Sequence, residues 1–290
     1  MAFMLATTRQ LTVRPVSERD LQGLANLIHF EAHVHRHLDW RAPLDWVGYH
    51  PYLVGEHNGE IMAALACPPD PPLVAWIRLF ATSSEMSVKL AWEELWSVAH
   101  DQLCQLDDIA LVAAIPLQRW FRNLLEKSNF VHTHNVIVLS WKRTPIPSLA
   151  ITHPGVIRTM ELRDINAVED LDRAAFGLIW QISTSGLEVA FRQAALASVV
   201  EIDGKIIGYQ ISTATPMGGH LARLAVLPQY QGQGIGYALL HDLLVQFERR
   251  GAQSVTVNTQ NDNLSSLALY RKAGFKRTGE EYPICQFQTS

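Results

Sequence analysis

The stretch QYQGQGIGYALL, from Gln229 to Leu240, carries the strongest signal in the chain. Gly232, Gly234 and Gly236 alternate in it, and an apolar run follows at once. Such glycines let a backbone approach another group closely, and the free amides at a helix N-terminus bind anions. The pattern is not a dinucleotide fingerprint, because Tyr237 takes the third glycine's place, and no Lys-Ser or Lys-Thr follows to make a triphosphate loop. A pyrophosphate seat at the start of a helix remains possible, as does a tight turn alone.

The composition is that of a globular protein. Of 290 residues, 48% are apolar and 18% charged, and this length predicts about two domains. Lys and Arg total 24 against 28 Asp and Glu, a net charge of -4, which argues against a nucleic-acid partner. The three cysteines are far apart, no apolar run reaches roughly 18 residues, and the first residues do not resemble a secretion signal. We therefore expect a soluble, cytoplasmic protein with no membrane partner.

The sequence repeats itself at a nearly constant offset. TVRPVSERDLQGLANL and VIRTMELRDINAVEDL align Arg14 with Arg158, and EHNGEI aligns with EIDGKI. IRLFA then matches ARLAV, and LLEKSNF matches LYRKAGF. Four separated matches in the same order predict two copies of one domain. We place them at residues 1–146 and 155–290, joined by the Pro-rich connector RTPIPSLAITHPG.

Both copies predict the same order of elements. A short strand leads into an amphipathic helix, and a hairpin then turns at Asn58-Gly59 or Asp203-Gly204. A strand, a long helix, a strand and a shorter helix follow. The last strand, at 135–141 or 282–288, is expected to close its own copy. This order predicts a mixed α/β (α+β) fold.

Two motifs carry a resemblance to a known family. RLAVLPQY followed by QGQGIG resembles the fourth strand and the coenzyme A loop, Q/R-x-x-G-x-G/A, of the GNAT superfamily of acyl-CoA-dependent N-acyltransferases. NLSSLALYRKAGF resembles the second signature, N-x-x-A-x-x-L-Y-x-K-x-G-F, with Ser266 in the small-residue place. The resemblance covers about residues 156–290 closely and 11–142 through the repeat only. It implies two tandem GNAT-like domains, each a central mixed, mostly antiparallel sheet flanked by helices.

The resemblance also implies acetyl-CoA as cosubstrate and no metal. In the family the fourth and fifth strands splay apart, the pantetheine arm pairs with the fourth strand, and the loop amides hold the pyrophosphate. An asparagine of the family forms a hydrogen bond near the pantetheine, and a tyrosine hydroxyl faces the thioester sulfur. The matching acyl-CoA-binding positions are Leu224, Ala225, Val226, Gln231, Gly232, Gln233, Gly234, Ile235, Gly236, Tyr237, Asn263 and Tyr270.

Three residues are the candidates for catalysis. Tyr270 matches the tyrosine that protonates the leaving thiolate, while the amide of Val226 would stabilise the oxyanion. The general base has two possible positions in the family. One is Asn258, which cannot accept a proton but could orient a water, and the other is His220, whose ordinary pKa of about 6.5 suits a base. His220 could also be only the residue that ends the turn PMGGH.

The first copy departs from the family pattern. It has MSVKLA over QGQGIG, and Leu125 over Tyr270. Bulky residues would obstruct a phosphate, and leucine offers no proton. We therefore expect a catalytically degenerate first copy, retained for packing, for shaping the substrate cleft or for binding something else.

A histidine-rich segment follows the first helix. HFEAHVHRH places His29, His33 and His37 on one face if that helix continues, where they could hold a divalent metal, line the amine cleft or face the solvent. We expect no metal, because the family needs none. The matching region of the second copy has Phe176 and Trp180, which could line an apolar acceptor pocket or be core residues.

The sequence thus predicts an acetyl-CoA-dependent N-acetyltransferase that acts on a primary amine, in a small molecule or at a peptide N-terminus, by direct attack on the thioester. One alternative is a non-catalytic acyl-CoA-binding or interaction protein. Another is a small-molecule acetyltransferase similar to the mycothiol synthases, tandem members of the superfamily with the same asymmetry. We expect a monomer or a homodimer.

Overall fold

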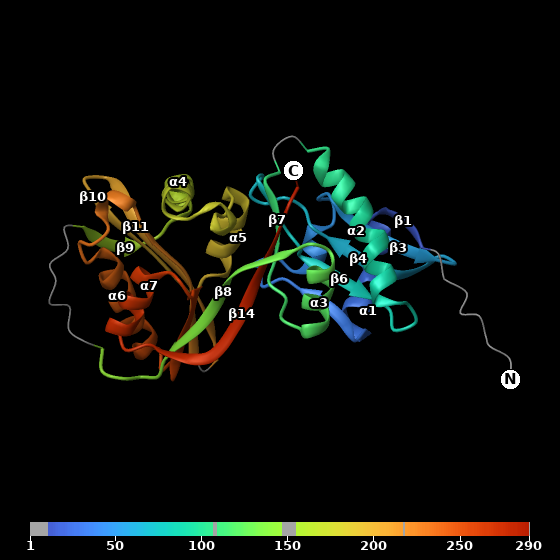
Figure 1. Ribbon diagram of the computed structural model, residues 1–290. Coiled ribbons are helices and arrows are strands. Elements are labelled where there is room, and N and C mark those ends of the chain that lie inside the picture. Colours follow the sequence, from blue (N-terminus) through green and yellow to red (C-terminus); the bar gives the residue numbers. More distant parts are fainter. Residues whose placement is uncertain (1–10, 107–108, 147–154, 217, 290) are drawn as a thin grey trace. The chain divides into compact units, whose positions relative to one another are not determined.

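The computed structural model describes residues 11–106, 109–146, 155–216 and 218–289 (Figure 1). The chain divides into two compact units. The first contains Met1–His132 and Cys285–Ser290, and the second contains Thr133–Ile284. Among the described residues, no helix is both long enough and apolar enough to cross a membrane.

The first unit is built on a five-stranded sheet in the order β1-β3-β4-β6-β2. Its expected strand at 74–80 is divided in two, since β5 pairs in parallel with β7 while β6 pairs with β4. The elements are β1 (Thr12–Pro15), α1 (Leu21–Phe30), β2 (His33–Arg36), β3 (Tyr52–His57), β4 (Glu60–Ala66), β5 (Val74–Trp76), β6 (Leu79–Thr82), α2 (Val88–Cys104), β7 (Leu111–Ala114) and α3 (Arg119–Lys127).

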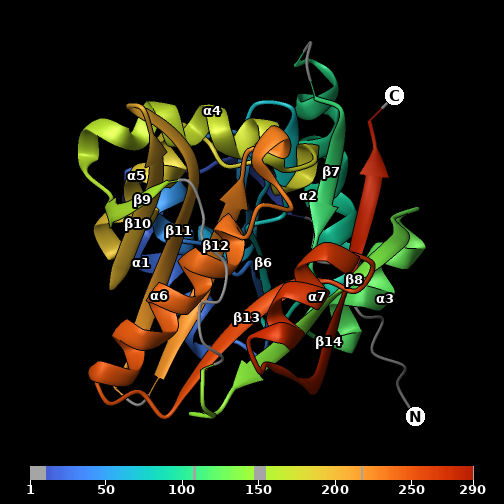
Figure 2. The same ribbon diagram turned by 90° about the vertical axis from the view of Figure 1, so that its left-hand side faces the viewer.

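The second unit is a sheet in the order β14-β8-β13-β12-β11-β10-β9, with α6 and α7 on one face and α4 and α5 on the other (Figures 1 and 2). Two central strands, β12 and β13, pair in parallel. On one side β13 pairs antiparallel with β8, and on the other β12, β11, β10 and β9 pair antiparallel in that order. The elements are β8 (Val131–Trp141), β9 (Val156–Thr159), α4 (Ile165–Ala175), α5 (Thr184–Gln193), β10 (Leu196–Ile202), β11 (Lys205–Thr215), β12 (Gly218–Val226), α6 (Ile235–Arg249), β13 (Ser254–Gln260), α7 (Leu264–Lys272) and β14 (Lys276–Gln288).

Both predicted hairpins are present. β3 and β4 turn at Asn58-Gly59, and β10 and β11 turn at Asp203-Gly204. All four turn residues have positive φ, 52° and 80° in the first turn and 48° and 78° in the second. Both central residues of a type I′ turn need this backbone conformation, which explains the Asn-Gly and Asp-Gly pairs.

The final strand of each copy forms, but in the sheet of the other copy. β8 pairs antiparallel with β13, from Val255↔Trp141 to Gln260↔Val136. The end of β14 pairs antiparallel with β7, from Cys285↔Ala114 to Gln288↔Leu111. The expectation that each of these strands closes its own copy is therefore wrong. Because the two copies offer equivalent sheet edges, either pairing satisfies the same backbone groups, and the hydrophobic pattern does not distinguish them.

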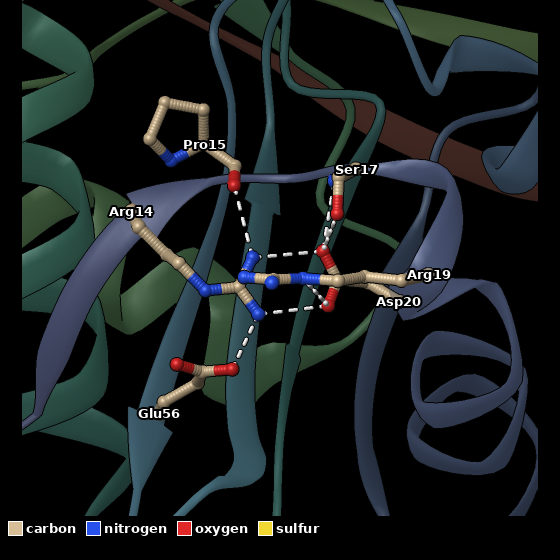
Figure 3. Close-up of polar contacts among 6 residues, drawn as sticks. All are labelled: Arg14, Pro15, Ser17, Arg19, Asp20 and Glu56. Carbon is tan, nitrogen blue, oxygen red and sulfur yellow. Dashed lines mark hydrogen bonds and ion pairs between the residues drawn. The ribbon is translucent and has the colours of Figure 1, made fainter.

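A network of ion pairs stabilises the turn between the first strand and the first helix of each copy. In the first unit Arg14 donates to both carboxylate oxygens of Asp20, at 2.8 and 2.7 Å, and also to Glu56 (Figure 3). Asp20 accepts the amide and the hydroxyl of Ser17 as well, at 2.8 and 2.9 Å. The Arg14 guanidinium holds the pKa of Asp20 well below its ordinary value. The network therefore joins β1, β3 and the start of α1.

The second unit repeats this network with Arg158, Asp164 and Glu201. Arg158 lowers the pKa of Asp164, so the stability it contributes is present above about pH 4, the ordinary carboxyl range, and is lost as the pH falls through the folded-state pKa. We expect Asp164→Asn to lower the free energy of unfolding by about 1–2 kcal/mol at pH 7 and by less at pH 3. Urea unfolding at both pH values measures this. Asp170→Asn, on an exposed side chain, is the control, and an equal loss at both pH values would contradict the prediction.

Candidate active site

The glycine loop leads directly into helix α6. Gly232 and Gly234 have φ of +77° and +81°, a conformation that side chains rarely adopt, and Gly234 is the N-cap of the helix. The side chain of Gln231 ties the loop to β12 by donating to the carbonyl of Val226 at 3.0 Å. The first amides of α6 have no partner within the helix, so they form an anion site with the positive end of the helix dipole.

Gly236 lies one residue inside the helix and has a different constraint. A Cβ built there would lie 3.6–3.8 Å from Leu269, Leu224 and Val226, which is ordinary contact. The packing of the protein therefore does not require glycine at this position. A glycine here leaves room for another group to approach the backbone between β12 and α7.

Beside this loop, β12 and β13 part. They pair in parallel from Gly218↔Ser254 only as far as Leu221↔Val257. Beyond that point β12 continues on β11 alone, and the amide of Leu227 donates to β11 at 2.9 Å. Alternate residues direct their backbone groups to opposite edges, so Ala225 also faces β11 whereas Leu224 and Val226 face the gap. No described strand pairs with that edge.

In the first unit the equivalent strands also part, but another strand of the same unit, β2, lies in the gap between them. β5 leaves β7 after Trp76↔Ala113, and β6 then pairs on its outer edge with β2. Residues 79–82 of β6 lie opposite residues 33–36 of β2. The position that the family gives to a pantetheine arm is therefore filled by residues 33–36.

This strand also corrects the expectation for the histidines. The first helix ends at Phe30, so His29, His33 and His37 do not share a helical face. His35 is buried and stacks on Phe121 with ring centroids 4.0 Å apart, and burial lowers its pKa to about 4. Among the described residues, no group of three or more His, Cys, Asp or Glu side chains is placed to hold a metal ion.

The other positions of the first unit carry no equivalent chemistry. Ser87 caps α2 by accepting the amide of Leu90 at 3.4 Å, so the helix start is partly satisfied by the chain itself. Ala75 and Ala113 occupy the repeat positions of the two base candidates, and the buried Leu125 occupies that of the tyrosine. These side chains cannot transfer a proton.

Tyr270 and Asn263 lie on helix α7. Tyr270 is buried, with its ring 5.6 Å from Phe275, and burial raises its pKa, so the phenol stays protonated at neutral pH. Asn263 is the N-cap of α7: its side-chain oxygen accepts the amide of Ser266 at 3.1 Å, and its amide group donates to Gln260 at 3.2 Å. The signature asparagine thus has a structural role that accounts for its place in the motif.

Both base candidates lie where the strands part. His220 precedes the last parallel pair on β12, and Asn258 follows it on β13. His220 Nδ1 lies 2.9 Å from the hydroxyl of Thr256, and burial lowers the pKa of His220, so the imidazole is neutral at pH 7. Asn258 is exposed. Their neighbours Leu221 and Val257 pack under α6 and α7, so His220 and Asn258 share the opposite face of the sheet.

The sequence analysis missed a buried ion pair on that face. Asp172 of α4 is fully buried, accepts the hydroxyl of Tyr209, and accepts Arg223 Nε at 3.0 Å. Arg223 also donates to the carbonyl of Trp180 at 2.8 Å and lies 4.4 Å from the centre of the Phe176 ring. Phe176 and Trp180 are therefore fixed against β12.

The repeat contained a signal for this pair. Arg223 aligns with Arg78, and Arg78 also pairs with a carboxylate, Asp39, at 2.9 Å and lies over a tryptophan, Trp46, at 4.5 Å. The arginine thus recurs at the parting of the strands in both units. Its acidic partner could not be found by alignment, because Asp39 follows β2 whereas Asp172 belongs to α4.

Comparisons with known proteins agree with this geometry. The profile of the Acetyltransferase (GNAT) family matches residues 165–275. The [ribosomal protein bS18]-alanine N-acetyltransferase of Escherichia coli K12 is 29% identical over 121 residues, 42% of this chain and 80% of that protein. N-alpha-acetyltransferase RimI of Mycobacterium tuberculosis is 40% identical over 80 residues, 26% of this chain and 49% of that protein. A tandem GNAT protein from the clavulanic acid biosynthesis pathway has a TM-score of 0.66 at 14% identity, covering 97% of this chain and 99% of that one.

Two central strands that part beside a helix beginning with glycines are the arrangement expected of an acyl-transfer domain. The three matched proteins are named as acetyltransferases or as a GNAT protein. Residues 165–275 are a GNAT acetyltransferase domain, and the protein is an N-acetyltransferase. The resemblance to the GNAT superfamily, the mixed α/β fold and the enzyme class predicted from the sequence are confirmed. A purely non-catalytic binding protein is correspondingly disfavoured.

Substitution of Gly236 tests the proposed acetyl-CoA binding site directly. We expect wild type to bind one acetyl-CoA per chain and Gly236→Ala to raise the dissociation constant about 10-fold or more, because the methyl group lifts the ligand from the amides. The melting temperature should not fall, since the Cβ has room and alanine favours a helix. Calorimetry and thermal melting measure both. Gly177→Ala, where an added Cβ would meet no atom within 4 Å, is the control. Unchanged affinity, or two comparable sites, would contradict the assignment.

Proposed function

We propose that the second unit transfers an acetyl group from acetyl-CoA to a primary amine at the parting of β12 and β13. The observation that carries the proposal is the edge of β12 at Leu224 and Val226, with which no described strand pairs, beside the start of α6. An extended arm can add to such an edge as a further strand. The amides from Gln231 to Tyr237 would hold the pyrophosphate at the helix N-terminus.

The reaction proceeds by direct attack and needs few groups. The amine nitrogen forms a bond to the thioester carbonyl carbon, and the carbon–sulfur bond breaks. The amide of Val226 stabilises the developing oxyanion, and Tyr270 gives a proton to the leaving thiolate. The proton of the amine passes to His220, directly or through a water that Asn258 orients.

The first unit takes no part in acetyl-CoA binding in this proposal, because β2 occupies the equivalent strand edge. Two lines bear on the acceptor. The relative from E. coli is named for an alanine of a ribosomal protein, which supports a peptide N-terminus. The tandem GNAT protein of similar fold is named for a small-molecule pathway, which keeps open a small amine of the kind expected for a mycothiol-synthase-like enzyme.

Replacement of the tyrosine tests the acid. Tyr270→Phe should lower kcat by about 10- to 1000-fold, the usual scale for a positioned proton donor, and leave the acetyl-CoA dissociation constant nearly unchanged. Steady-state kinetics and calorimetry on one preparation measure the two effects. Phe275→Leu, which alters the ring beside Tyr270 but not its hydroxyl, is the control. Full turnover in Tyr270→Phe would mean that the thiolate leaves without this proton.

The pH profile tests the base. Because burial lowers the pKa of His220 and the neutral imidazole is the active form, activity should be lost as the pH falls through a value below the ordinary 6.5. His220→Ala should remove this acid limb, leaving the ionisation of the amine substrate itself. Asn258→Ala should lower the rate without moving the limb, since an amide does not titrate. The measurement is kcat/KM against pH for the three proteins.

Thr256 provides the matched control for that profile. Thr256→Val removes the hydroxyl beside His220 Nδ1 but keeps the shape of the side chain. The acid limb should persist in this variant, displaced only by the loss of the hydrogen bond. Profiles of the same shape in wild type and His220→Ala would leave His220 as a turn residue.

A further inference from the structure

The acceptor must approach the parting of β12 and β13 from one particular face. Helices α6 and α7 cover the other face, where Leu221, Val257 and Tyr270 lie in one apolar cluster (Figure 2). Arg223 points away from that cluster, since it pairs with Asp172 on α4. An amine therefore has access from the side of α4 and α5, the side that carries His220 and Asn258.

The exchanged strand β8 forms part of this acceptor side. Asn258 lies opposite Val138, and Gln260 lies opposite Val136. Ile137 and Leu139 belong to the apolar cluster under α6 and α7, so the alternate residues Val136, Val138 and His134 lie on the acceptor side. Residues that precede the connector in the sequence thus stand beside the base candidates of the second copy.

The segment between α4 and α5 meets the same strand. The ring of Trp180 lies 5.7 Å from that of His134, at 61°, and both residues are half-buried. Trp180 is held in place through its carbonyl by Arg223, and Asp172 fixes the far end of the segment by accepting the amide of Ile182 at 3.1 Å. The indole is therefore positioned by a buried ion pair rather than by its own packing alone.

We infer that Trp180 and His134 form the acceptor wall of the enzyme and select amines with an apolar or aromatic substituent. The inference rests on the proposed function of the second unit. The two half-buried aromatic rings offer contact area to an apolar group. The charge of Arg223 is already balanced by Asp172, so it does not provide an ion pair for an acidic substituent.

A panel of acceptors tests the wall in the full chain. The probes are tetrapeptides that differ only in their first residue, phenylalanine, leucine, aspartate or lysine, together with phenethylamine and ethanolamine. Wild type should use the phenylalanine and leucine peptides and phenethylamine with the lowest KM. Trp180→Ala should raise the KM for these about 10-fold, with a much smaller effect on kcat and on the acetyl-CoA dissociation constant.

Two further variants separate recognition from folding. His134→Ala should weaken the same preference, and His134→Phe, which restores a ring, should recover it. Trp120→Ala removes a half-buried indole of the first unit and should leave acceptor KM values unchanged, with melting temperatures recorded for all variants. The inference is overturned if wild type binds acetyl-CoA but does not prefer apolar amines, or if Trp180→Ala leaves every acceptor KM unchanged. Failure to bind acetyl-CoA would overturn the proposed function, and this inference with it.

Discussion

The parting of two parallel strands is the constraint on which both units depend. When β12 leaves β13, the backbone groups of its outer edge lose their partners, and unpaired amides and carbonyls away from water are costly. Something must pair with them. In the proposed function the second unit leaves its edge to an incoming arm, whereas the first unit places its own β2 there. Under that proposal, the same parting of strands is a binding site in one copy and a strand pairing within the protein in the other.

The two solutions make different demands on neighbouring residues. Where the edge is left open, glycine at 236 and the left-handed Gly232 and Gly234 keep the helix start accessible. Where the edge is filled, the chain needs no such access, and Ser87 caps the corresponding helix. Alanine and leucine at the proton-transfer positions fit a unit that has lost the ligand rather than one that binds a different thioester.

Local features of this fold could be predicted, and long-range pairing could not. The hairpins, the glycine loop and the long helices depend on neighbours within a few residues, so their patterns predicted them correctly. Tyr270 and His220 were found because each lies in or near a motif of fixed spacing, although their roles stay predictions. The strand β2, the exchanged strands and the Asp172–Arg223 pair depend on partners remote in sequence, and a short apolar run does not specify which edge it joins.

The exchange of β8 and β14 has a consequence for how the protein is made. The hydroxyl of Thr289 donates to the carbonyl of Ile109, 180 residues earlier in the chain. The β7 edge therefore has no partner until residues 285–288 have been synthesised, and unpaired sheet edges attract other chains. Folding must also wait for loop closure over this distance, which slows non-local pairing. Cells that overproduce this enzyme are expected to depend on chaperones for the nascent first half.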